Sequence, residues 1–165
     1  MPWAAASSGG GVGSGPANAI GTALALKDSG RLCVGVVGDG DFCMGGSALW
    51  TAAHMGIPLL LVIANNRVYY NDVAHQELMA KKRGRPVENK FVGQEMNDPP
   101  VDLVGLARAQ GVAAEGPFAT AAELAAALLR GEQAVRAGKP YVIEALIDVG
   151  APGEGNRGHT AGRRE

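Results

Sequence analysis

The sequence predicts an α/β domain in three layers, with helices on both sides of a mainly parallel sheet. Two continuously apolar runs carry this prediction, because strands that are buried on both faces have this pattern. They are LCVGVV at residues 32–37 and LLLVIA at residues 59–64. A helix-compatible segment over 45–55 lies between them, and two parallel strands joined by a helix form a right-handed βαβ unit.

The other segments continue the alternation of helix and strand. Further helices are expected over 17–27, 101–110 and 120–137, and further strands over 112–114 and 141–147. Pro16 stands where the first turn of the first helix is expected. Thr120 and Glu123 have the spacing of a capping box, which predicts where the longest helix begins. The segment 67–96 is polar and charged, and only residues 73–82 within it favour a helix.

Composition excludes several functional classes. The chain has 165 residues, 47% of them hydrophobic and 19% charged, which is typical of one globular domain. Its 15 basic and 16 acidic residues give a net charge of -1, which disfavours nucleic acid or an anionic membrane as a partner. No apolar run is long enough to span a bilayer, and no signal peptide is visible. Cys33 and Cys43 alone form no disulfide framework, so we expect a cytoplasmic protein.

The domain is expected over residues 1–149, and the glycine-rich, charged residues 150–165 are expected to form a flexible tail. No transmembrane, nucleic-acid-binding or zinc-binding pattern interrupts this single domain. A functional site is expected at the ends of the predicted strands, because ligands of parallel α/β sheets bind beyond the carboxyl ends of the strands.

Polar residues follow the two apolar runs directly. Gly38-Asp39-Gly40-Asp41 follows the first, and Asn65-Asn66 follows the second. Glycines allow a phosphate to approach backbone N–H groups at a helix start, but two carboxylates repel a phosphate unless a divalent cation intervenes. Mg²⁺ binds carboxylate, amide and phosphate oxygens together. The residues therefore predict a Mg²⁺-diphosphate site at Asp39 and Asn66, although each cluster alone is also ordinary turn chemistry.

The stretch from Gly38 to Asn66 resembles the signature of thiamine-diphosphate-dependent enzymes, which is GDG followed at a distance by NN. It stands here as GDGDFCMGGSALWTAAHMGIPLLLVIANN. The flanking segments are similar to the C-terminal diphosphate-binding domain of acetolactate synthase-like and benzoylformate decarboxylase-like enzymes. These segments are GVGSGPANAIG at 11–21, DPPVDLVGLARAQGV at 98–112 and KPYVIEALI at 139–147. The resemblance covers nearly the whole chain up to Val149.

The resemblance implies thiamine diphosphate and Mg²⁺ as cofactors. It assigns the metal to Asp39, to the side chain of Asn66 and to the backbone carbonyl of Val68. The diphosphate would lie against the motif at Gly38 and accept hydrogen bonds from the backbone N–H groups of Gly40 and Asp41.

Two further residues receive roles from the resemblance. Val12 would stand where the family places a bulky apolar residue under the cofactor, and valine is a smaller support than the Met, Leu or Ile that relatives often have. The carbonyl of Gly10 would face the 4′-amino group of the cofactor. The cofactor's own chemistry would then cleave or form a C–C bond next to a carbonyl.

The resemblance also implies that this chain needs a partner. The family's activating glutamate lies in a pyrimidine-binding domain that nothing in the chain resembles. We expect a lyase or transferase, a 2-oxoacid decarboxylase or carboligase, that is inactive alone and works in a homo- or hetero-oligomer. The missing domain would come from another subunit of a split enzyme or from the rest of a longer chain, and the split enzyme is the reading we favour.

Two other functions are alternatives to this prediction. One is a non-catalytic cofactor-binding or regulatory module that retains the Mg²⁺-diphosphate site. The other is a flavodoxin-like or Rossmann domain for a different nucleotide. It is disfavoured because no strand is evident before the glycine-rich segment at 11–15.

Overall fold

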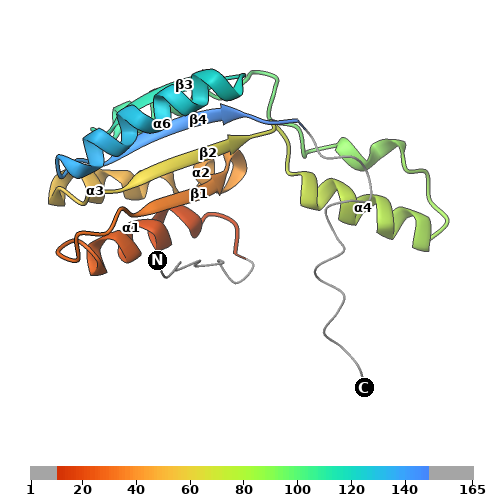
Figure 1. The fold of residues 1–165 in the computed structure, drawn as a ribbon. Coiled ribbons are helices and arrows are strands. Elements are labelled where there is room, and N and C mark those ends of the chain that lie inside the picture. The colour runs from red at the N-terminus through yellow and green to blue at the C-terminus, as the bar shows by residue number, and fades with distance from the viewer. Residues whose placement is uncertain (1–10, 149–165) are drawn as a thin grey trace. The chain divides into compact units, whose positions relative to one another are not determined.

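The structure is a computed structural model that describes residues 11–148. Its described residues fall into two compact units, a larger one of residues 11–65 and 101–147 and a smaller one centred on residues 66–100. The larger unit contains the sheet, and Figure 1 shows its strands side by side with helices around them.

The sheet is parallel throughout, which confirms the predicted fold class. Its strand order is β1-β2-β4-β3, and each neighbouring pair runs in the same direction. The strands are β1 (Val34–Gly38), β2 (Leu60–Asn65), β3 (Ala113–Phe118) and β4 (Tyr141–Leu146). Because the strands are parallel, their carboxyl ends lie along one edge of the sheet.

Helices cover both faces of the sheet, so the larger unit has three layers. The helices of one layer are α1 (Gly15–Ala25), α2 (Asp39–Gly45), α3 (Leu49–Met55) and α5 (Leu103–Ala109). They pack in a core around Phe42, Leu61 and Ile63. On the other face, α6 (Ala121–Arg136) packs Ala127 and Val135 against Leu60 and Ile143. Alternate residues of β2 thus face opposite layers, as the pleat requires.

The helix after β1 begins earlier than the sequence predicts. The predicted helix over 45–55 contains α3, but the sequence predicts a turn at 38–41, where the structure has α2 beginning at Asp39 directly after the strand. The short 3₁₀ helix η1 (Gly46–Ala48) then joins α2 to α3. Glycines at positions 40 and 45 have low helix propensity, but the complete burial of Phe42 on this helix outweighs that cost.

The smaller unit contains α4 (Tyr70–Lys82) and the 3₁₀ helix η2 (Glu88–Phe91). Glu77 joins these two elements, because its carboxylate forms ion pairs with Lys81 on α4 and Lys90 on η2. Hydrogen bonds from both lysines lower the pKa of Glu77 to about 2. None of the helices within residues 11–148 has the length and apolar character that a membrane crossing requires.

The capping box of α6 is present as predicted, and it gives a test of the fold. The Thr120 hydroxyl accepts a hydrogen bond from the Glu123 N–H, and the Glu123 carboxylate accepts one from the Thr120 N–H. Thr120→Ala should lower the free energy of unfolding by roughly 0.5–2 kcal/mol, measured by urea denaturation. The matched control is Thr51→Ala on the exposed side of α3, and equal losses in both variants would contradict the capping role.

The ion pairs of Glu77 predict how the smaller unit depends on pH. Because the folded pKa lies below the ordinary value of 4.5, the ionised carboxylate stabilises the unit above pH 4.5. That contribution is lost as the pH falls from 4.5 toward about 2. A carboxyl NMR titration should place the Glu77 midpoint near 2, and Glu77→Gln should flatten the pH dependence of unfolding in this range. A midpoint near 4.5 would contradict the ion pairs.

Candidate cofactor site

The carboxyl ends of β1 and β2 lie side by side in the larger unit. Gly38, the last residue of β1, is in register with Ala64, and β2 ends one residue later at Asn65. A Cβ atom added at Gly38 would meet no described heavy atom within 4 Å, so the space beside this strand end is open. The predicted GDG and NN segments therefore leave the sheet at the same edge.

Asp39 is the first residue of α2 and is only 5% exposed. A carboxylate at that depth is costly to ionise unless cations or hydrogen-bond donors compensate its charge. The N–H groups of the first helical turn, which include those of Gly40 and Asp41, have no partner within the helix. The side chain of the residue before the helix does not cap them either, because that residue is Gly38.

Asp41 has a role that sequence reasoning missed. Its Oδ1 atom accepts hydrogen bonds from the backbone N–H groups of Gly13 and Gly15. The carboxylate therefore binds the glycine-rich segment before α1. The sequence contains a signal for this contact, since a second acidic residue beside a phosphate site needs donors of its own.

Val12 lies in the same glycine-rich segment. The turn from Gly11 to Ser14 is closed by hydrogen bonds that the Ser14 N–H and hydroxyl donate to the Gly11 carbonyl. Val12 stands at the tip of this turn with 55% of its surface exposed, so its side chain is accessible to a ligand. Gly10, to which the resemblance assigned a carbonyl contact, lies outside the described residues.

Asn66 and Val68 form a tight corner at the start of the smaller unit. The Asn66 Oδ1 accepts the Val68 N–H at 3.1 Å, and the Val68 carbonyl accepts the Tyr70 N–H at 2.9 Å. Arg67 between them has a φ of 59°, a left-handed conformation that no other non-glycine residue in the described part of the chain adopts. Each of the two oxygens has a second lone pair, so its hydrogen bond leaves it able to bind a metal.

A buried pair supports the end of β2 next to this corner. Asn65 and Glu144 are both buried, and the Asn65 amide donates a hydrogen bond to the Glu144 Oε1 at 2.7 Å. Gly116 makes room for the chain here, because a Cβ at that position would come within 2.9 Å of the Glu144 Cβ. Sequence reasoning missed Glu144, although a single carboxylate within a buried apolar strand was a visible signal.

The Asp39 carboxylate suits a hard cation better than a transition metal. Among residues 11–148, no three His, Cys, Asp or Glu side chains converge to hold a metal. Cys43 lies on α2 as well, but burial and the Asp39 carboxylate raise the pKa of its thiol. A raised pKa disfavours the thiolate, which is the form that binds a metal. Carboxylate, amide and carbonyl oxygens are the ligands that Mg²⁺ prefers, and it usually completes its shell with phosphate and water.

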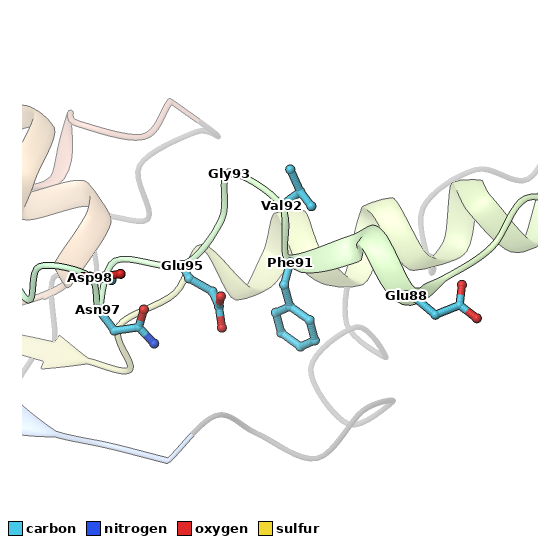
Figure 2. A pocket seen from close by; sticks show the side chains of 7 residues that line it. All are labelled: Glu88, Phe91, Val92, Gly93, Glu95, Asn97 and Asp98. Atoms are coloured by element: carbon cyan, nitrogen blue, oxygen red, sulfur yellow. The ribbon is translucent and has the colours of Figure 1, made fainter.

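Each unit has a pocket that is lined by residues other than those of the predicted site. One of about 330 Å³ belongs to the smaller unit, and Figure 2 shows the side chains around it. It is lined by Glu88, Phe91, Val92, Gly93, Glu95, Asn97 and Asp98. Three carboxylates disfavour a diphosphate or a 2-oxoacid there, and none of the predicted site residues lines it. Another pocket, of about 340 Å³, is lined by Ala113 and Tyr141, where β3 and β4 begin, at the opposite edge of the sheet.

Comparison with known proteins shows the family of this chain. Residues 2–145 match the family described as thiamine pyrophosphate enzyme, C-terminal TPP binding domain, where thiamine pyrophosphate is another name for thiamine diphosphate. The chain belongs to this family. The match covers most of the chain and confirms the resemblance that the GDG and NN segments indicate.

Solved structures of longer enzymes share the fold of this domain. The thiamine diphosphate-dependent 4-hydroxybenzoylformate decarboxylase of Rhodococcus jostii is 28% identical with a TM-score of 0.62, over 83% of this chain and 23% of that one. Benzoylformate decarboxylase from Polynucleobacter necessarius is 24% identical with a TM-score of 0.66, over 86% of this chain and 25% of that one. The chain thus spans about a quarter of the length of these enzymes.

The Asn65–Glu144 pair gives a test of what supports the end of β2. Glu144→Leu should lower the free energy of unfolding by about 1–3 kcal/mol, because it leaves a buried amide without this acceptor. Glu144→Gln keeps an acceptor oxygen and should cost less. Urea denaturation measures both variants, and a Glu144→Leu variant as stable as the wild type would show that the pair does not support β2.

Proposed function

We propose that this chain binds thiamine diphosphate with Mg²⁺ and supplies the diphosphate half of the active site of a 2-oxoacid decarboxylase or carboligase. The observation that carries the proposal is the buried Asp39 carboxylate. It follows β1 directly, beside the open space at Gly38, in a chain that belongs to the thiamine diphosphate family. A buried carboxylate next to open space at a strand end is suited to hold a cation that in turn holds a phosphate.

The chemistry of the residues in the GDG and NN segments suits Mg²⁺ and a diphosphate. Asp39 would bind Mg²⁺ with its carboxylate, Asn66 with its amide oxygen and Val68 with its backbone carbonyl. The backbone N–H groups of Gly40 and Asp41 belong to the first turn of α2 and would donate to the diphosphate. When bound, thiamine diphosphate supplies a nucleophilic carbon and an electron sink for chemistry next to a carbonyl.

The electrostatics explain why the metal and the diphosphate are expected together. A diphosphate beside the Asp39 carboxylate brings like charges close, and this repulsion is strong in a region of low dielectric constant. A divalent cation between them converts the repulsion into two attractions. The positive end of the α2 dipole adds a smaller favourable contribution to the diphosphate.

The complete enzyme would need polypeptide beyond this domain. The chain covers about a quarter of each of the two solved decarboxylase chains. On β1, at the edge of the sheet, Val34 and Val36 are 52% and 71% exposed, and α6 packs on the other three strands. An apolar strand surface of this kind is typical of a face that another polypeptide covers. The proposal therefore includes a pyrimidine-binding domain, from a partner subunit or from further chain, that supplies the activating glutamate.

The same comparison supports the proposed substrate class. The 28% identical enzyme of Rhodococcus jostii is, by its description, a decarboxylase of 4-hydroxybenzoylformate, which is a 2-oxoacid. We extend only the class to this chain, as a 2-oxoacid or another carbonyl compound whose adjacent C–C bond is cleaved or formed. Without a pyrimidine-binding partner, the chain is expected to bind the cofactor and to turn over no substrate.

Two substitutions test the ligand assignment. Asp39→Ala should abolish the Mg²⁺-dependent part of thiamine diphosphate binding, because it removes the charged ligand of the cation. Asn66→Leu should weaken binding less, because one neutral oxygen is lost. Isothermal titration calorimetry with and without Mg²⁺ measures both effects, with Asp28→Ala as the exposed carboxylate control. Wild-type affinity in Asp39→Ala would refute the assignment.

Supplying a pyrimidine-binding partner separates the enzyme from a regulatory module. A complex that consumes a 2-oxoacid only when both chains and the cofactor are present supports the enzyme. A chain that binds thiamine diphosphate tightly but gives no turnover with any partner found in its own cell would favour the non-catalytic module.

A further inference from the structure

The Asp41 side chain joins two segments that are separated in the sequence. Asp41 lies in the first turn of α2, and its Oδ1 accepts hydrogen bonds from the N–H groups of Gly13 and of Gly15, the latter at 3.4 Å. Gly15 is the first residue of α1, and Gly13 lies in the turn before it. Glycine-rich segments have many accessible conformations, so a carboxylate that binds two of their N–H groups selects one of them.

The turn also packs closely against α2. A Cβ atom at Gly15 would overlap the Asp41 carboxylate and lie 2.9 Å from a methyl group of Val37. A Cβ atom at Gly45 would overlap the carbonyl oxygen of Gly13. Gly13 has a φ of 96°, which side chains rarely adopt. Glycines at positions 13, 15 and 45 therefore allow the turn and α2 to approach closely enough for this contact.

The negative charge of Asp41 has two opposing effects on cofactor binding. A carboxylate in the first turn of α2 would repel a diphosphate bound at the same turn. The two N–H groups of the glycine-rich turn offset part of that charge through charge-assisted hydrogen bonds. Such a residue favours cofactor binding only if ordering the turn contributes more than the remaining repulsion costs.

We propose that Asp41 is a positioning residue that holds the turn of residues 11–15 on α2 and thereby fixes Val12 for the cofactor. The inference rests on the proposed function, because Val12 is the side chain expected under the cofactor. Val12 is more than half exposed, so its own packing does not fix it. Its position depends on the backbone on either side, and Asp41 binds the next residue, Gly13.

Three variants and one control test this role. Asp41→Ala removes the acceptor, and Asp41→Asn keeps an acceptor oxygen but removes the charge. Gly15→Ala disrupts the same contact without changing Asp41, because its methyl group would overlap the carboxylate. Gly21→Ala is the matched control on α1, since a Cβ there meets no described atom within 4 Å.

Amide hydrogen exchange in the absence of cofactor measures the contact directly. Asp41→Ala and Gly15→Ala should speed exchange at Gly13 by about tenfold or more. The first variant removes the carboxylate that accepts the hydrogen bond of the Gly13 N–H, and the second displaces it. Exchange in α6 should not change, which separates local loosening from general destabilisation. Asp41→Asn should lie between the wild type and Asp41→Ala, and Gly21→Ala should match the wild type.

Titration with thiamine diphosphate and Mg²⁺ then tests the consequence. Asp41→Ala and Gly15→Ala should weaken binding by about fivefold or more, and Asp41→Asn should restore most of the affinity. Unchanged exchange at Gly13 would overturn the proposal. Faster exchange with equal or tighter cofactor binding would overturn it too, because repulsion would then outweigh positioning. If the wild type binds no cofactor, the proposed function fails, and the exchange data alone decide whether Asp41 holds the turn.

Discussion

The buried carboxylate of Asp39 is the constraint on which the rest of this site depends. A carboxylate that is nearly inaccessible at the end of a parallel strand is costly to ionise unless its surroundings supply positive charge or donors. The surroundings in this chain are suited to do so. Gly38 leaves open space beside the strand end, the helix begins at Asp39 itself, and its first-turn N–H groups face an expected anion. In our proposal Mg²⁺ would bind the carboxylate and the diphosphate, and the diphosphate would accept hydrogen bonds from these N–H groups.

A second carboxylate in the same helical turn serves a different purpose. Asp39 is buried and directed to a metal in our proposal, whereas Asp41 binds backbone N–H groups of the glycine-rich turn. Two positions along a helix are about 200° apart around its axis, so the two side chains leave α2 on different sides. Two acidic residues two positions apart can therefore stand beside one anion site, because each has its own source of positive potential.

The sequence predicts the architecture well and the local geometry less well. The continuous apolar runs locate β1 and β2, and the spacing of Thr120 and Glu123 locates the start of α6. The predicted burial on both faces is confirmed for β2 but is wrong for β1, the edge strand, whose Val34 and Val36 are 52% and 71% exposed. The sequence predicts the helix at α3 but not α2, which occupies residues 39–45. Helix propensity is a weak guide there, because the burial of Phe42 decides the conformation.

The supporting contacts of the site were not predictable from the pattern alone. Asp41 with Gly13, and Asn65 with Glu144, are contacts between residues far apart in the sequence, and they depend on how strands and turns pack. The family resemblance assigns the proposed metal and diphosphate residues because that motif has fixed spacing. It says nothing of the contacts that the Asp41 and Glu144 carboxylates make with Gly13 and Asn65.

The most direct test of the account is a titration of the wild-type chain with thiamine diphosphate, with Mg²⁺ present and with a chelator in its place. Thiamine monophosphate serves as the comparison ligand, because it lacks the diphosphate. The account predicts saturable binding of thiamine diphosphate with Mg²⁺, and affinity lower by about tenfold or more with the chelator or with the monophosphate. Equal affinity under all three conditions, or no binding under any, would contradict it.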